Sequence, residues 1–184
     1  MENIKYIHKV SILREDIVVE EDSMEAVPLK LSGNLMLVLY LYDFISDGYK
    51  ILCLEDITEC KKKELDKFHN YILQQQGVIN NIDRIENLNI DSWKNVFCYM
   101  HDNEVMLDIS LEKTESGRNF FVGKVEEVND DNIMFREFTT LGIKKNKRKR
   151  LFYNDITLVS FGNKYSEMLD KYGTEYADYA GKKV

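Results

Sequence analysis

The sequence predicts an α+β protein that is mainly β, built from two similar small, strongly bent antiparallel sheets or partial barrels, each followed by a short helix. The first observation behind this prediction is a repeat, because Asp56-Ile57-Thr58 recurs as Asp155-Ile156-Thr157. The second is that each triplet closes a run of strand-like sequence and precedes one short helical pattern ending in Gly. The third is the number of short strand patterns with tight turns, which favours small barrels.

The composition indicates a folded chain without a flexible linker. Hydrophobic residues make up 44% of the 184 residues, which is enough for a core. The chain contains one proline and nine glycines, and no stretch rich in Pro or in Gly and Ser divides it. We therefore expect the two halves to pack on each other.

Residues 1–77 form the predicted first half. Strands are expected over 4–13, 17–21, 35–42, 49–54 and 56–61, with a turn at Ser46-Asp47-Gly48. Nearly every residue of 35–42 is apolar, which predicts a strand covered on both faces. Leu65, Phe68 and Ile72 are spaced as one face of an amphipathic helix, and Gly77 suits the position just after its end.

Residues 78–104 read as a packed connector. The segment 78–90 is rich in Asn and Asp and gives no clear periodicity. Asp91-Ser92 can cap a short helix that carries Trp93, Val96, Phe97 and Met100.

Residues 105–173 form the predicted second half, and 174–184 a C-terminal tail. Strands are expected over 105–111, 120–128, 133–138, 151–154 and 157–161, with turns at 116–117 and 129–132. Gly123 inside a strand suggests a bulge or a sharp bend of a small barrel. Tyr165, Met168, Leu169 and Tyr172 predict a helical face, and Gly173 a helix end. The tail tyrosines Tyr176 and Tyr179 could continue that face, but Gly173 favours a break and a docked or frayed tail.

Placed side by side, the halves share their order of elements. The second copy is predicted to carry an insertion that contains a basic loop, residues 144–150. In the first half Tyr42-Asp43-Phe44, Asp47-Gly48-Tyr49 and Asp56-Ile57-Thr58, then Phe68, Ile72-Leu73 and Gly77, resemble a pattern in an uncharacterised bacterial family. Val122-Gly123-Lys124-Val125, Asp155-Ile156-Thr157 and Tyr165 with Leu169 are similar to its second half. The resemblance implies tandem Sm-like small β-barrels and brings no catalytic residues with it.

No segment predicts a membrane span, and the start of the sequence lacks the pattern of a signal peptide. Cys53, Cys60 and Cys98 are odd in number and have no Cys-x-x-Cys spacing, which indicates reduced thiols. We therefore expect a cytoplasmic protein.

The sequence offers no catalytic, cofactor or metal motif that predicts an enzyme. His8, His69 and His101 are scattered; Cys98 and His101 could supply two zinc ligands, but a site needs three or four. Asp108 is expected on a solvated strand face. The repeated Asp56 and Asp155 suit acceptors of hydrogen bonds from neighbouring backbone N–H groups better than catalytic acids.

The basic segment is the sharpest local feature and leads to one functional hypothesis. One interpretation is a solvated loop without a binding role on an otherwise acidic protein. The other is a loop that holds RNA phosphates, as in an Sm-like RNA-associated protein. Its six cations are Lys144, Lys145, Lys147, Arg148, Lys149 and Arg150.

The acidic character leads to the other hypothesis, which we prefer. The formal net charge of −7 suits a basic protein partner. Carboxylate clusters could plug the basic cleft of a nuclease, as in an immunity-type inhibitor of a bacterial toxin. The clusters comprise Glu20, Glu21, Asp22 and Glu25, then Glu126, Glu127, Asp130 and Asp131.

Overall fold

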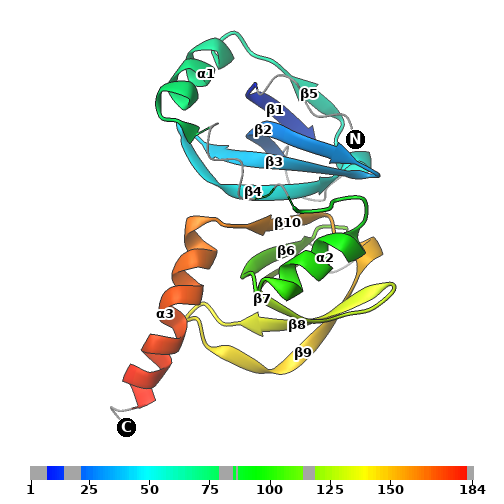
Figure 1. Ribbon diagram of the computed structural model, residues 1–184, viewed down its shortest axis with the longest axis vertical. Helices are drawn as coiled ribbons and strands as arrows, with labels where there is room; N and C mark the ends of the chain where they lie inside the picture. Colours follow the sequence, from blue (N-terminus) through cyan, green and yellow to red (C-terminus); the bar gives the residue numbers. More distant parts are fainter. Residues whose placement is uncertain (1–7, 15–21, 79–84, 86, 114–118, 182–184) are drawn as a thin grey trace.

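A computed structural model describes residues 8–14, 22–78, 85, 87–113 and 119–181 (Figure 1). The prediction of a mainly β protein is confirmed: ten strands form one antiparallel sheet in the order β5-β1-β2-β3-β4-β10-β6-β7-β8-β9. The first half contains β1 (Val10–Arg14), β2 (Asp22–Ser32), β3 (Leu35–Tyr42), β4 (Ile45–Cys53), the 3₁₀ turn η1 (Leu54–Asp56), β5 (Glu59–Lys61) and α1 (Asp66–Gln75). The remainder contains α2 (Trp93–Asp102), β6 (Leu107–Leu111), β7 (Asn119–Val128), β8 (Asn132–Phe138), β9 (Lys144–Phe152), the 3₁₀ turn η3 (Tyr153–Asp155), β10 (Leu158–Phe161) and α3 (Lys164–Gly181).

The two halves join along β4 and β10. These strands pair antiparallel, with Ile51 opposite Val159 and Leu52 opposite Leu158, and all four side chains are buried. The ten strands are therefore continuous through this junction, instead of lying in two separate sheets. The expected strand 17–21 and the turn 116–117 lie outside the described residues.

The internal repeat extends to the hydrogen-bond register. Each half has the same strand order, since β5-β1-β2-β3-β4 corresponds to β10-β6-β7-β8-β9. Val10 pairs with Ala26 in the first half as Leu107 pairs with Gly123 in the second. A bulge interrupts β2 opposite β3, and another interrupts β7 at the corresponding place opposite β8. The halves are thus two copies of one structural unit.

Aligning the two copies by their strands shows that the prediction of an inserted basic loop was wrong. The basic segment is not a loop but most of β9, the counterpart of β4. The turn of the first half was also misplaced: β3 and β4 are connected at Asp43, whose φ is 52°. Gly48 lies inside β4, where φ is +75° and an added Cβ would come within 2.5 Å of the backbone nitrogen of Asn163. Gly48 therefore permits close approach of the halves.

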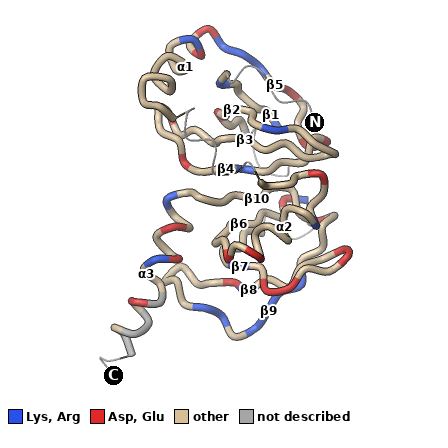
Figure 2. Tube along the Cα trace, viewed as in Figure 1, with Lys and Arg blue, Asp and Glu red and all other residues tan. Residues whose placement is uncertain are grey.

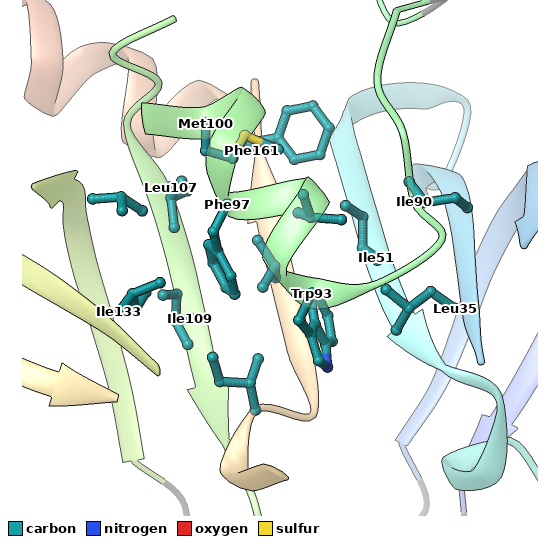
Figure 3. Packing of buried hydrophobic residues seen from close by; sticks show 14 of the residues in the cluster. Leu35, Ile51, Ile90, Trp93, Phe97, Met100, Leu107, Ile109, Ile133 and Phe161 are labelled. Carbon is teal, nitrogen blue, oxygen red and sulfur yellow. The ribbon is translucent and has the colours of Figure 1, made fainter. Parts of the chain in front are cut away.

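The largest core cluster lies between the two halves and beneath α2 (Figure 3). The predicted cap is confirmed, because the Ser92 hydroxyl accepts a hydrogen bond from the backbone nitrogen of Asn95 at 3.3 Å. The four predicted apolar residues of this helix are all buried. Among them, Trp93 and Phe97 stack with ring centroids 5.8 Å apart. The connector helix therefore supplies core residues to both copies of the repeat, as expected for halves that pack on each other.

The helix α1 ends as predicted but exposes the face that was expected to be buried. Gly77 follows it with φ of 66°. Leu65 and Phe68, however, are exposed, whereas Leu73 and Asp66 are buried. The buried Asp66 carboxylate accepts a hydrogen bond at 2.7 Å from Lys9, the residue just before β1. A polar contact thus determines how this helix packs, and the spacing of apolar residues in the sequence gives no sign of it.

The helix α3 does not end at Gly173 but continues to Gly181, so the predicted boundary between helix and tail is wrong. Gly173 is buried, and an added Cβ would lie 2.4 Å from the carbonyl oxygen of Gly142. This glycine allows the turn between β8 and β9 to contact the helix. It serves packing, not termination.

Both outer edges of the sheet carry positive charge (Figure 2). At one end β9 presents exposed Lys and Arg side chains, and at the other Lys61, Lys62 and Lys63 are exposed. Charged side chains on an unpaired edge oppose pairing with another strand.

Candidate functional site

An open cleft of about 680 Å³ lies where the two copies of the repeat meet. Its walls come from the start of β3, the end of β4, the turn between β7 and β8, the two 3₁₀ turns and the start of α2. We call it the junction cleft; it is lined by Asn34, Leu35, Cys53, Glu55, Asp56, Asp91, Ser92, Trp93, Lys94, Lys113, Asp130, Tyr153, Asn154, Ile156 and Thr157.

The repeated triplets shape this cleft through their threonines. Thr58 donates its backbone N–H and its hydroxyl to the carbonyl of Leu13, at 3.0 and 3.2 Å. Thr157 does the same to Ser110, at 3.1 Å in both bonds. Each triplet is thereby fixed to the first strand of its own copy. The second triplet supplies Ile156 and Thr157 to the cleft wall.

The two repeated aspartates do not share one role. Asp155 is exposed, whereas Asp56 is 1% exposed. Among the described residues no backbone N–H donates to the Asp56 carboxylate, which instead forms an ion pair with Lys113 and lies 3.8 Å from the Arg14 guanidinium. The predicted hydrogen-bonding role is therefore wrong for Asp56.

A buried charge network supports this side of the cleft. Arg14 Nη2 lies 2.6 Å from Glu112 Oε2, and both side chains are fully buried. The Thr157 hydroxyl shares its single proton between the Ser110 carbonyl and this carboxylate oxygen, which lies 2.7 Å away. Because Arg14 belongs to the first copy and Glu112 to the second, the network fixes one copy against the other.

The walls of the cleft carry more carboxylates than amines. Asp56, Asp130, Glu55 and Asp91 face two lysines. Lys94 contacts Asp130 at 2.6 Å, and its hydrogen bond lowers the pKa of that carboxyl. Among the described residues Glu55 forms no ion pair, and Asp91 accepts a hydrogen bond from the Ser32 hydroxyl. With both lysines neutralised, the cleft retains negative charge.

Aromatic rings complete the wall beside these carboxylates. Tyr153 stacks on Phe97 with centroids 5.8 Å apart, and Phe97 stacks on Trp93. The Tyr153 hydroxyl donates to the carbonyl of Asn129 at 2.8 Å. Burial raises the pKa of Tyr153 to about 12, so the phenol stays neutral. Carboxylates beside aromatic faces form a site suited to an ammonium or guanidinium group.

The cysteine of the cleft is held as a thiol. Burial and the nearby Asp56 raise the pKa of Cys53 to about 11, and its sulfur donates to the carbonyl of Ile156 at 3.6 Å. Because the thiolate is the nucleophilic form, Cys53 is poorly suited to covalent chemistry at neutral pH.

The first predicted acidic cluster is only partly described. Glu20 and Glu21 lie outside the described residues, as does the side chain of Asp22. Glu25 contacts Lys9 at 2.5 Å and Lys63 at 2.9 Å. Burial would raise the pKa of Glu25, but these hydrogen bonds lower it to about 2.

Ion pairs also occupy most of the second acidic cluster. Glu126 binds Arg136 at 2.8 Å and Lys144 at 3.0 Å, and these contacts lower the pKa of Glu126 to about 2. Glu127 lies 3.6 Å from Arg148. A protein partner would have to compete with these cations. Of the predicted acidic residues whose side chains are described, only Asp130 lines the junction cleft.

The cations of β9 are partly neutralised by their neighbours. Lys145 and Lys149 both pair with Glu137, in addition to the contacts of Lys144 and Arg148. Lys147 and Arg150 form no ion pair with any described residue. Lys149 also lies over the ring of Phe121, 3.9 Å from its centroid. The basic segment is therefore far less cationic than its sequence suggests.

Asp108 was expected on a solvated face but is 6% exposed. It accepts a hydrogen bond from Asn163 at 2.6 Å. Burial raises the pKa of Asp108 to about 6, even though this hydrogen bond and the charge of Lys50 act to lower it. The prediction was wrong because Asn163 comes from the start of α3, a distant part of the chain.

Sequence reasoning missed most of the cleft. Glu55, Lys113 and the segment from Asp91 to Lys94 lie far apart in the sequence, and no spacing links them. The one available signal was the repeated triplet, which marks the place where the copies adjoin. In the part of the chain that is described, no three His, Cys, Asp or Glu side chains are grouped as a metal site requires.

No family model, curated protein or solved structure matches the chain. Among the described helices, none combines the length and apolar character needed to cross a membrane.

Proposed function

We propose that this chain is a protein-binding module whose junction cleft receives a cationic side chain from a basic protein partner. The observation that carries the proposal is the charge of the cleft wall. Its two lysines are already paired with Asp56 and Asp130, while Glu55 and Asp91 line the same cleft as Trp93 and Tyr153. An arginine or lysine entering the cleft would gain carboxylate and aromatic contacts together.

The biological role that we propose is that of an immunity-type inhibitor, which neutralises a basic bacterial toxin such as a nuclease. A nuclease needs cations to hold phosphates, and an acidic surface can occupy them in place of the nucleic acid. The net charge of −7 favours encounter with such a partner. The junction is a suitable anchor because it is built from paired strands and buried residues and needs little reorganisation on binding.

We further propose that each half is an Sm-like partial barrel. The shared strand order and the corresponding bulges in β2 and β7 support this assignment. So does the 3₁₀ turn that links the last two strands of each copy.

The proposed function is tested by pull-down of the tagged protein from its native host, with mass spectrometry of the eluate. Two variants are compared with the wild type: Glu55→Lys with Asp130→Lys in the cleft, and Glu64→Lys with Asp102→Lys away from it. The four residues are exposed and the change in charge is the same. We expect one stoichiometric basic partner that the wild type and the second variant retain and the cleft variant loses.

Retention of the partner by the cleft variant would exclude the cleft as the anchor. Equal loss in both variants would mean that only overall charge matters. An enzymatic assay of the purified partner, with and without this chain, then decides whether binding inhibits it.

RNA association through β9 is the second candidate, and two observations favour it. Lys147 and Arg150 have no ion pair among the described residues, and the neighbouring Phe152 is exposed. Replacing Lys147, Arg148, Lys149 and Arg150 by Ala should then abolish RNA binding at low salt. Absence of RNA binding by the wild type at low salt would end this candidate.

A further inference from the structure

The helix α3 carries a continuous stripe of large, exposed side chains. Successive residues of an α-helix are 100° apart, so residues spaced three and four apart lie on one face. The stripe consists of Tyr165, Met168, Tyr172, Tyr176 and Tyr179, which are 37–55% exposed. These five side chains run along nearly the whole of a helix of 18 residues.

The stripe is separate from the face that α3 buries in its own chain. That face contains Ser166, which is 1% exposed, and Gly173, which contacts Gly142. The core of the second half therefore does not cover the stripe. Figure 1 shows the C-terminal part of α3 extending away from the sheet.

The projecting part of α3 would gain stability from additional packing. In proteins most of the stability of a helix comes from tertiary packing of one of its faces. Tyrosine is enriched at protein interfaces because it buries a large area at small entropic cost. An aromatic stripe along a projecting helix therefore indicates an interface.

We propose that the stripe binds the same stripe of a second copy of this chain, with the two α3 helices antiparallel and a two-fold axis near Tyr172. Tyr172 then meets its own counterpart. Tyr165 of one copy lies beside Tyr179 of the other, and Met168 beside Tyr176. Such an isologous interface closes after two copies.

The charges along the stripe support the antiparallel direction. Lys171 and Glu175 are exposed and border the stripe on the same side, one turn apart. In an antiparallel pair the same sides face each other, so Lys171 of each copy lies near Glu175 of the other. A parallel pair would instead place this side against the opposite side of the partner helix.

The expected size of the interface predicts a weak dimer. A fully buried aromatic side chain covers about 150–250 Å², and these are already half covered, so the two stripes together would bury roughly 1,000 Å². This area is near the lower limit for specific interfaces. The dimer should therefore form at high protein concentration and dissociate on dilution.

Sedimentation equilibrium over a range of protein concentrations tests the proposal. We expect the apparent mass of the wild type to rise toward twice that of the monomer, and Tyr172→Glu to remain monomeric. Tyr71→Glu is the matched control, because Tyr71 is an exposed tyrosine on α1, outside the stripe. A wild type that stays monomeric, or a Tyr172→Glu variant that still associates, would overturn the proposal.

Charge exchange tests the direction of the helices. Lys171→Glu and Glu175→Lys should each weaken association by about three- to tenfold, because each removes two exposed ion pairs related by symmetry. The double variant restores the pairs and should recover the association. Failure of the double variant to recover, while circular dichroism shows an intact helix, would exclude the antiparallel arrangement.

Discussion

Arg14 and Glu112 form a buried ion pair across the two copies of the repeat, with Nη2 and Oε2 2.6 Å apart. Both side chains are fully buried, and Arg14 Nε and Nη1 have no hydrogen-bond partner among the described residues. Burying charge in this way costs free energy that the pair only partly recovers. Its advantage is specificity, because the pair forms only when the copies are correctly placed.

Removing one partner of this pair should lower the stability of the protein more than removing both. Arg14→Met leaves the Glu112 carboxylate buried without its cation, which should lower the free energy of unfolding by about 3 to 5 kcal/mol. Arg14→Met combined with Glu112→Leu removes both charges and should be milder. Chemical denaturation of the three proteins measures the difference, and equal, additive losses would contradict this account.

Gly173→Ala should destabilise the protein, although alanine favours helices. Helix propensity alone predicts a gain of up to about 1 kcal/mol. The new Cβ, however, would lie 2.7 Å from the Gly142 Cα and closer still to its carbonyl oxygen. We expect a lower melting temperature and faster hydrogen exchange in α3. Lys164→Ala, at an exposed position of the same helix outside the proposed interface, is the control and should not show this loss.

Asp108→Asn should stabilise the protein at pH 8 but not at pH 4. The folded pKa of Asp108 is raised from 3.8 to about 6. Its contribution to stability is therefore fully present below pH 4 and is lost as the pH rises through 6. Each unit of pKa shift corresponds to about 1.4 kcal/mol, so the gain at pH 8 should be about 2 to 3 kcal/mol. Urea unfolding at both pH values measures it.

The wild type and Asp108→Asn must be compared with each other at each pH, because other carboxyls change the pH dependence of stability in the opposite direction. The folded pKa values of Glu25 and Glu126 are lowered to about 2. Their stabilisation is present above pH 4.5 and is lost as the pH falls through 2. An effect of Asp108→Asn that is the same at pH 4 and pH 8 would contradict the raised pKa.

The lysines of β9 should prevent strand pairing between molecules. Replacing Lys145, Lys147 and Lys149 by Thr keeps a strand-forming sequence but removes half of the positive charge of β9. We expect time-dependent association, detected by light scattering. Replacing Lys61, Lys62 and Lys63 tests the opposite edge in the same way. A triple β9 variant that stays monodisperse would show that charge is not what protects this edge.

The parts of the fold that depend on local pattern could be predicted from the sequence. The apolar run 35–42, the cap at Ser92 and the repeated triplet each identified an element in the right place. β9 could not be recognised, because its seven residues 144–150 are all polar and show no alternation. The apolar face of α1 was placed wrongly and α3 was ended too early, because Asp66 and Gly173 determine the packing through contacts with distant Lys9 and Gly142.

The candidate site was harder to predict for the same reason. Asp130 was identified as acidic, but its proximity to Glu55 and Lys113 follows from the pairing of β4 with β10. Nothing in the local sequence encodes that pairing. The prediction of the acidic clusters did not include Arg136 and Lys144, which lie on neighbouring strands and neutralise Glu126.

The pairing of β4 with β10 also has a direction. In the first copy the two outer strands are β5 and β4, and their counterparts in the second copy are β10 and β9. The joint pairs β4 with β10, so unlike edges meet and the copies are joined head to tail. The same joint could in principle be repeated without limit. Covalent connection makes this one joint independent of protein concentration. The lysines at both free ends oppose a third copy. The two copies are thus joined as neighbouring units of an open assembly would be, but within one chain.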